Sequence, residues 1–149
     1  MTSEIAKRSI RPKVLRTRRA GPDHQVVTVK SPCKAYRREP CPKCPWRKDA
    51  VGEFPPEAFV HSAETAYDMA EHLFACHDSG SAKPATCAGF LLRGADHNLA
   101  VRLGRMSGRY GDDVVDGGHE LHESYRDMAI ANGVDPDEPR LVACRGPSG

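Results

Sequence analysis

Two cysteines at close spacing, Cys41 and Cys44 in the stretch CPKCPWRKD, constrain this chain more than any other feature. A tight turn between them aims both sulfurs the same way, so two thiolates can reach one ion. The same spacing occurs in iron–sulfur sites and in thioredoxin-like redox pairs. A redox pair needs its first cysteine at a helix N-terminus in a βαβ setting, whereas this pair lies among prolines. The stretch therefore favours a metal site.

The cellular compartment expected for the chain supports this interpretation. No apolar run approaches the roughly 20 residues that span a bilayer, and the N-terminus lacks the apolar segment of a secretory signal. We therefore expect a cytoplasmic protein, in which disulfides are rare. Six cysteines in that compartment point first to a metal. The alternative is that several of them are small buried apolar residues.

A tetrahedral site needs two further ligands, and Cys76 and Cys87 are the natural choice because they flank a polar loop. His77 is an alternative ligand, a hydrogen-bond donor to a ligand sulfur, or an exposed turn residue. Cys33 is expected to be a loop thiol, and Cys144 is left unassigned. Four thiolates suit Zn²⁺ and a 4Fe-4S cluster equally, with the Cys-Pro-x-Cys turn slightly favouring zinc. A closed zinc site of this kind would be structural.

The chain is thin in apolar material, with 39% hydrophobic and 6% aromatic residues among 149. One small domain that depends on a metal staple is the expected result. Apolar spacing predicts helices within 55–76 with a break at Ser62, over about 98–107, and over 119–133. Asp96 or Asn98 is the candidate cap of the second helix and Gly108 its end, and Asn132-Gly133 is the stop of the third. The runs QVVTVK and RLVAC are candidate strands, and GFLL is helical or a short buried strand. We therefore predict a mainly helical α+β fold.

Basic residues are concentrated at the N-terminus, where the first twenty residues hold seven basic groups and only Glu4 as an acid. This predicts a flexible basic arm over 1–30, a metal-stapled domain over 31–145 and a disordered tail over 146–149. The arm is either a solvated tail or a nucleic-acid contact. Its candidate contacts are Lys7, Arg8, Arg11, Lys13, Arg16, Arg18 and Arg19.

Two further features carry weaker signals. In HELHE, His119 and His122 stand three residues apart, whereas a hydrolytic zinc motif needs four, so a zinc hydrolase is only a minor alternative to a polar helix face. Trp46 and Arg47 follow the cysteine pair. One possibility is that they cover the metal turn, with Arg47 paired to an acid such as Asp49; the other is that they contact a nucleic acid. The covering role is favoured, because a single aromatic residue makes a poor stacking platform.

The blocks CPKCPWRKD, GEFP, FACH and CAGFLL resemble an uncharacterised family of small proteins from actinobacteria and their phages. The resemblance covers roughly residues 41–105 and implies that Cys41, Cys44, Cys76 and Cys87 belong together. It implies no activity. The expected function is a small structural-zinc module that contacts nucleic acid or a transcription-type partner and is not favoured as an enzyme. The main alternative is a 4Fe-4S redox or sensor protein.

Overall fold

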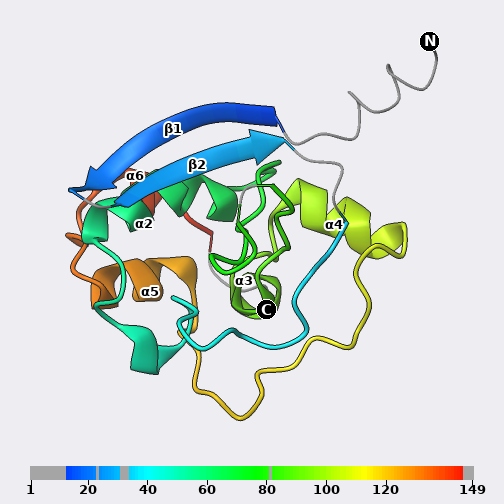
Figure 1. Ribbon diagram of the computed structural model, residues 1–149. Helices are drawn as coiled ribbons and strands as arrows, with labels where there is room; N and C mark the ends of the chain where they lie inside the picture. Colours follow the sequence, from blue (N-terminus) through cyan, green and yellow to red (C-terminus); the bar gives the residue numbers. More distant parts are fainter. Residues whose placement is uncertain (1–12, 23, 31–33, 81, 146–149) are drawn as a thin grey trace.

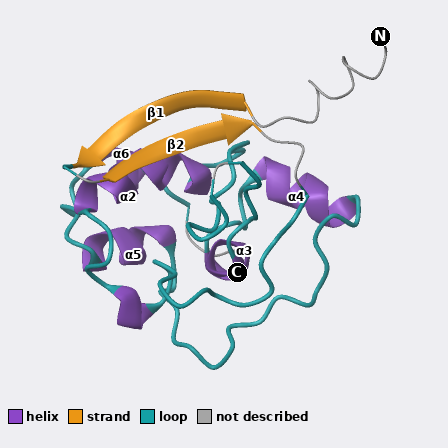
Figure 2. Cartoon of the chain, viewed as in Figure 1, coloured by secondary structure: helices purple, strands orange, loops and turns teal. Residues whose placement is uncertain are grey.

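A computed structural model describes residues 13–22, 24–30, 34–80 and 82–145. The strands are β1 (Lys13–Gly21) and β2 (His24–Lys30), the 3₁₀ helices are η1 (Lys48–Ala50) and η2 (Ala63–Ala66), and the α-helices are α2 (Pro56–Ser62), α3 (Ala88–Arg93), α4 (Leu99–Met106), α5 (Tyr125–Ala131) and α6 (Pro139–Val142). The two strands lie across α2 and α6, with α5 below them and α4 at the right of the view (Figures 1 and 2). Within the described ranges no helix has the length and apolar character needed to cross a bilayer.

The prediction of a mainly helical fold is wrong, because only 31% of residues are helical. The helix expected within 55–76 breaks at Ser62 as predicted but stops after η2 at Ala66. Beyond it, the backbone N–H of Met69, at φ 60°, donates to His97 O at 2.9 Å, and Leu99 N donates to Ala70 O at 2.7 Å. These long-range bonds hold residues 67–76 out of a helix and lead the chain to Cys76.

Residues 13–30, which the sequence suggested as a flexible arm, form an antiparallel hairpin with register shifts at Leu15 and Ala20. The strand predicted in QVVTVK is confirmed as part of β2, while β1 was not expected because its basic residues hide any apolar alternation. The hairpin packs on α2, and Ala20 is buried at 6% exposure. The predicted contacts Lys7, Arg8 and Arg11, and the predicted tail 146–149, lie outside the described residues.

The later helices follow their predicted ends more closely than their starts. Asn98 caps α4 by accepting from Val101 N at 3.0 Å, and Gly108 at φ 83° follows its end, as expected. The helix predicted over 119–133 begins only at Tyr125, capped by Ser124. The first residues of the predicted range are not helical, because His122 N donates to Trp46 O at 2.9 Å. GFLL is helical in α3, and RLVAC contains α6 instead of a strand.

The core is built around Trp46, which is fully buried. Its ring meets Phe74 and Tyr125 edge to face, with centroid distances of 6.0 and 5.8 Å. Tyr125 also donates its hydroxyl to Phe59 O at 2.6 Å, which ties α5 to α2. Because no part of the Trp46 ring reaches the surface, it cannot stack on a base. The ring packs against Gly89 and Gly94 of the α3 segment, and a cover over the cysteine turn stays a prediction.

Candidate metal centre

The first half of the cysteine cluster is the turn at Cys41–Cys44. Cys44 N donates to Cys41 O at 3.0 Å, and Arg47 N donates to Cys44 O at 3.0 Å, which winds the chain tightly around the two thiols. Arg47 also reaches back to Cys41 O at 3.3 Å and pairs with Asp49 at 2.8 Å, as the sequence indicated. The turn is therefore braced from both sides by the residues of CPKCPWRKD.

The second half comes from two extended segments that pair antiparallel beside this turn. Cys76 N donates to Ala85 O at 2.7 Å, and Cys87 N donates to Phe74 O at 2.9 Å. Cys87 is then the residue that precedes α3, with Leu91 N donating to its carbonyl at 3.1 Å. The polar loop between the two cysteines thus returns them to neighbouring positions.

The four thiols come together as two pairs, Cys44 with Cys87 and Cys41 with Cys76. Cys44 Sγ and Cys87 Sγ are 3.6 Å apart and both residues are buried. Burial and then the neighbouring Cys76 and Cys44 raise the pKa of Cys41 to about 12. The bond with Cys44 and burial raise the pKa of Cys87 well above the ordinary thiol value. Deprotonating several neighbouring thiols is unfavourable because the thiolates repel one another, and a bound cation would offset this repulsion.

Cys44 is the exception, because its pKa is lowered. The bond from Cys87 is the largest cause, and the backbone N–H groups of Trp46, Gly89 and Arg47 also stabilise its thiolate, against the effect of burial. Backbone N–H groups aimed at a sulfur are a common feature of metal-bound thiolates, whose charge they help to disperse. Cys44 is therefore stabilised as a thiolate, which is the form in which a cysteine binds a metal.

The surface end contains a mixed donor group of Cys41, His77 and Asp78, whose ligand atoms all lie within 4.8 Å of one another. His77 Nε2 is 3.0 Å from Cys41 Sγ, and His77 Nδ1 is 3.3 Å from Asp78 Oδ1. His77 thus links a cluster thiol to a carboxylate. Sequence reasoning included His77 but missed Asp78, whose only signal was its position directly after Cys76 and His77.

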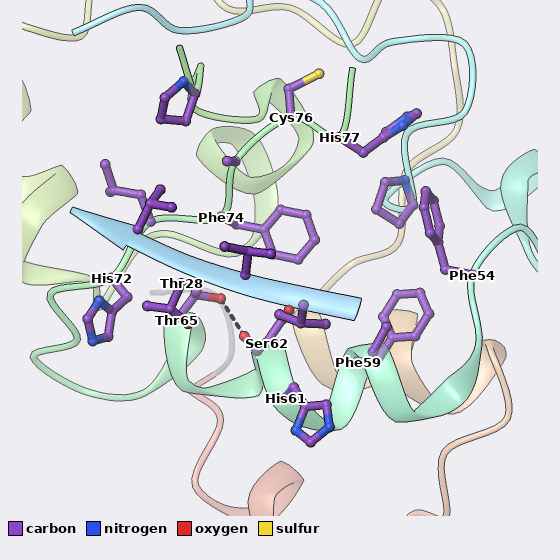
Figure 3. A pocket seen from close by; sticks show the side chains of 18 of the residues that line it. Thr28, Phe54, Phe59, His61, Ser62, Thr65, His72, Phe74, Cys76 and His77 are labelled. Carbon is purple, nitrogen blue, oxygen red and sulfur yellow. Dashed lines mark hydrogen bonds between the residues drawn. The ribbon is translucent and has the colours of Figure 1, made fainter. Parts of the chain in front are cut away.

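A pocket of about 400 Å³ adjoins this end of the cluster. It lies between β2, α2 and the extended segment 72–77, with Phe54, Phe59 and Phe74 in its walls and Cys76 and His77 at one side (Figure 3). No sequence pattern indicated this pocket, because its walls come from segments that are far apart along the chain.

The other candidate residues are placed elsewhere. Cys33 lies outside the described residues, and Cys144 Sγ contacts Ala63 O and Arg140 O, both at 3.6 Å. His119 is half-buried and His122 is buried, and both precede α5 in a loop, so HELHE does not form a helical motif. Lys13, Arg16, Arg18 and Arg19 are carried by β1.

His122 leads to a prediction about pH. Its side chain is 5% exposed, and its Nε2 has no hydrogen-bond partner among the described residues. Burial, followed by Lys48, lowers its pKa below the usual 6.5. The unfolded chain therefore binds a proton at His122 more readily than the folded chain does. The contribution of neutral His122 to the free energy of unfolding is fully present above about pH 6.5 and is lost as the pH drops through and below that value.

Urea unfolding between pH 7.5 and 5.5 measures this loss, and His122→Gln is expected to show a smaller fall in the free energy of unfolding than the parent chain. An equal fall in both proteins would show that His122 does not contribute to it. Because the two proteins share the same cysteines, acid effects on the cluster cancel in the comparison.

Comparison with known proteins places the chain in a family but gives no activity. No curated protein and no solved structure matches it. Residues 36–145 match a family described as "Family of unknown function (DUF6283)". The matched range includes the Cys41–Cys44 turn, Cys76, Cys87 and all five α-helices. The chain thus belongs to the DUF6283 family of unknown function.

Proposed function

We propose that this chain is a small structural-zinc module in which Cys41, Cys44, Cys76 and Cys87 hold one Zn²⁺. The observation that carries the proposal is the 3.6 Å separation of Cys44 Sγ and Cys87 Sγ. In a tetrahedral zinc site with Zn–S bonds of about 2.3 Å, two sulfurs lie about 3.8 Å apart. The buried thiols are therefore spaced as the edge of a single-ion site.

The same spacing disfavours the alternative of a 4Fe-4S cluster. In such a cluster each thiolate binds a different iron, and the cluster itself separates the ligand sulfurs more widely than one ion does. The pair Cys44 and Cys87 would have to move apart, although both are buried against Trp46 and α3.

In this proposal the ion joins three parts of the chain. The Cys41–Cys44 turn, the extended segment at Cys76 and the start of α3 at Cys87 meet there, and no coordination position is left for a substrate. The role is therefore a scaffold for binding, with nucleic acid or a transcription-type protein as partner in the cytoplasm. We also propose that related chains occur in actinobacteria and their phages.

Metal analysis of protein purified without oxygen tests the proposal. We expect colourless protein with one zinc per chain and no iron, because the closely spaced thiols fit one ion. Brown protein with broad visible absorbance and several irons per chain would instead establish the cluster. Protein that contains neither metal, and gains no structure when Zn²⁺ is added, would refute both.

A further inference from the structure

The β1–β2 hairpin is a basic ribbon on an acidic body. Residues 13–30 contain five basic residues and one acidic residue, whereas residues 34–145 contain fourteen basic and eighteen acidic residues. The hairpin therefore carries a net charge of opposite sign to the domain on which it packs. Such a separation of charge is typical of a surface that meets a polyanion.

The basic side chains of β1 differ in how far their charge is compensated. Arg16 forms an ion pair with Glu64 and donates to Thr28 Oγ1 at 3.3 Å, and Arg19 donates to Gly21 O at 3.3 Å. Arg18 has no hydrogen bond or ion pair within the described part of the chain. Its charge is available for an external partner.

Arg140 of α6 adds a second such charge at the same place. Its guanidinium lies 3.3 Å from His61 Nδ1 and has no ion pair with any described acid. His61 Nε2 also lies 3.2 Å from Arg19 O, which places Arg140 beside β1. Burial, then Arg16, then Arg140 lower the pKa of Arg18, as expected for neighbouring cations. Unlike Arg16, neither Arg18 nor Arg140 has an ion-paired acid among the described residues, and an anion that binds between these two would relieve their repulsion.

The shape of the hairpin indicates which polyanion fits. A two-stranded antiparallel ribbon can enter the major groove of B-form DNA, whereas the major groove of duplex RNA is too narrow for it. The register shifts at Leu15 and Ala20 mark bulges, which increase the twist of a ribbon. Neither strand contains Phe, Tyr or Trp, so the ribbon lacks the aromatic platform on which single strands stack.

We propose that the β1–β2 ribbon and α6 bind the phosphate backbone of duplex DNA, with Arg18 and Arg140 as the phosphate contacts. This inference rests on the proposed scaffold role and names the partner and the surface. Contacts of this kind fix the protein on the duplex without reading its sequence. Arg16, which is held by Glu64, positions the ribbon and contributes less.

The test uses the full chain loaded with zinc and a fluorescent 24-base-pair duplex, with affinity measured by anisotropy between 50 and 200 mM salt. Arg18→Gln and Arg140→Gln are each expected to weaken binding about five- to tenfold near 0.1 M salt and to reduce the salt slope by about one. Arg93→Gln is the matched control, because it removes one positive charge from an arginine paired with Glu123. It should change affinity less than twofold.

Several results would overturn the proposal. Parent-like affinity in both Arg18→Gln and Arg140→Gln, or an equal loss in Arg93→Gln, would show that these two arginines form no phosphate site. Tighter binding to a single strand of the same length would exclude the duplex as the preferred partner. Binding to vesicles containing phosphatidylserine, without binding to the duplex, would assign the surface to a membrane.

The zinc content of every variant separates this inference from the proposed scaffold role. Variants that keep one zinc and lose DNA binding support both. Variants that keep one zinc and bind DNA normally overturn only the DNA surface. Lys7, Arg8 and Arg11 are present in all the proteins compared, so any contribution from them cancels.

Discussion

Replacing Cys87 by serine is expected to remove the proposed zinc and unfold the chain. Cys87 lies at the buried end of the cluster, 3.6 Å from Cys44 Sγ, and begins the segment that becomes α3. A serine hydroxyl is a poor zinc ligand, and structural zinc in small domains contributes about 10 kcal/mol or more of folding free energy. Zinc content and far-ultraviolet circular dichroism, measured on the same purified sample, should fall together.

Two matched variants show whether the loss is specific to the cluster. Cys144→Ser should keep one zinc and parent-like structure, because the Cys144 thiol bonds to Ala63 O and Arg140 O and to none of the four cysteines. His77→Ala should retain zinc with an affinity about 10- to 100-fold weaker, as expected for a partner of a ligand. Full zinc in Cys87→Ser would mean that another residue is the fourth ligand, and complete loss in His77→Ala would identify that residue as His77.

The second large effect is expected from adding one methyl group beside Trp46. In Gly94→Ala the new Cβ would overlap the buried indole, lying 2.6 Å from Cζ2 and closer still to Cη2. Trp46 has no free space to turn into, because Phe74 and Tyr125 pack on its ring. Overpacking of this kind typically costs 1–3 kcal/mol, and we expect about 3 kcal/mol here because the overlap is with a rigid ring.

Urea unfolding of zinc-saturated protein measures this loss. Gly21→Ala is the control, since its added Cβ would meet Pro55 Cγ at an ordinary 3.7 Å. The control should stay within about 0.5–1 kcal/mol of the parent, the range expected of a tolerated glycine substitution. Equal stability of Gly94→Ala and Gly21→Ala would show that the packing around Trp46 is looser than the structure indicates.

The sequence predicted those parts of the fold that are set by local chemistry. Asn98 and Gly108 marked α4 because a side-chain cap and a positive φ are requirements of single residues. Asn132 and Gly133 marked the end of α5 for the same reason. The choice of Cys41, Cys44, Cys76 and Cys87 depended on spacing, and the structure brings their thiols together in two pairs, while their binding of metal stays a prediction.

The parts that the sequence could not predict are set by long-range contacts. Residues 67–76 have helical spacing, yet bonds to His97 and from Leu99 hold them out of a helix. The strand β1 exists because β2 and α2 lie beside it, and its own residues do not alternate between polar and apolar. Asp78 joins the surface donor group through a turn whose shape is fixed by Ser79, which donates to Cys76 O at 2.7 Å.

The short helices have a consequence for how the protein is made. None of the described helices exceeds the eight residues of α4, and isolated helices shorter than about 12–15 residues are marginal in water. Local structure therefore cannot form first and assemble later. Trp46 at one third of the chain finds its partner Tyr125 only near the end. A ribosome would have to release almost the whole chain before any of it became protected from proteases.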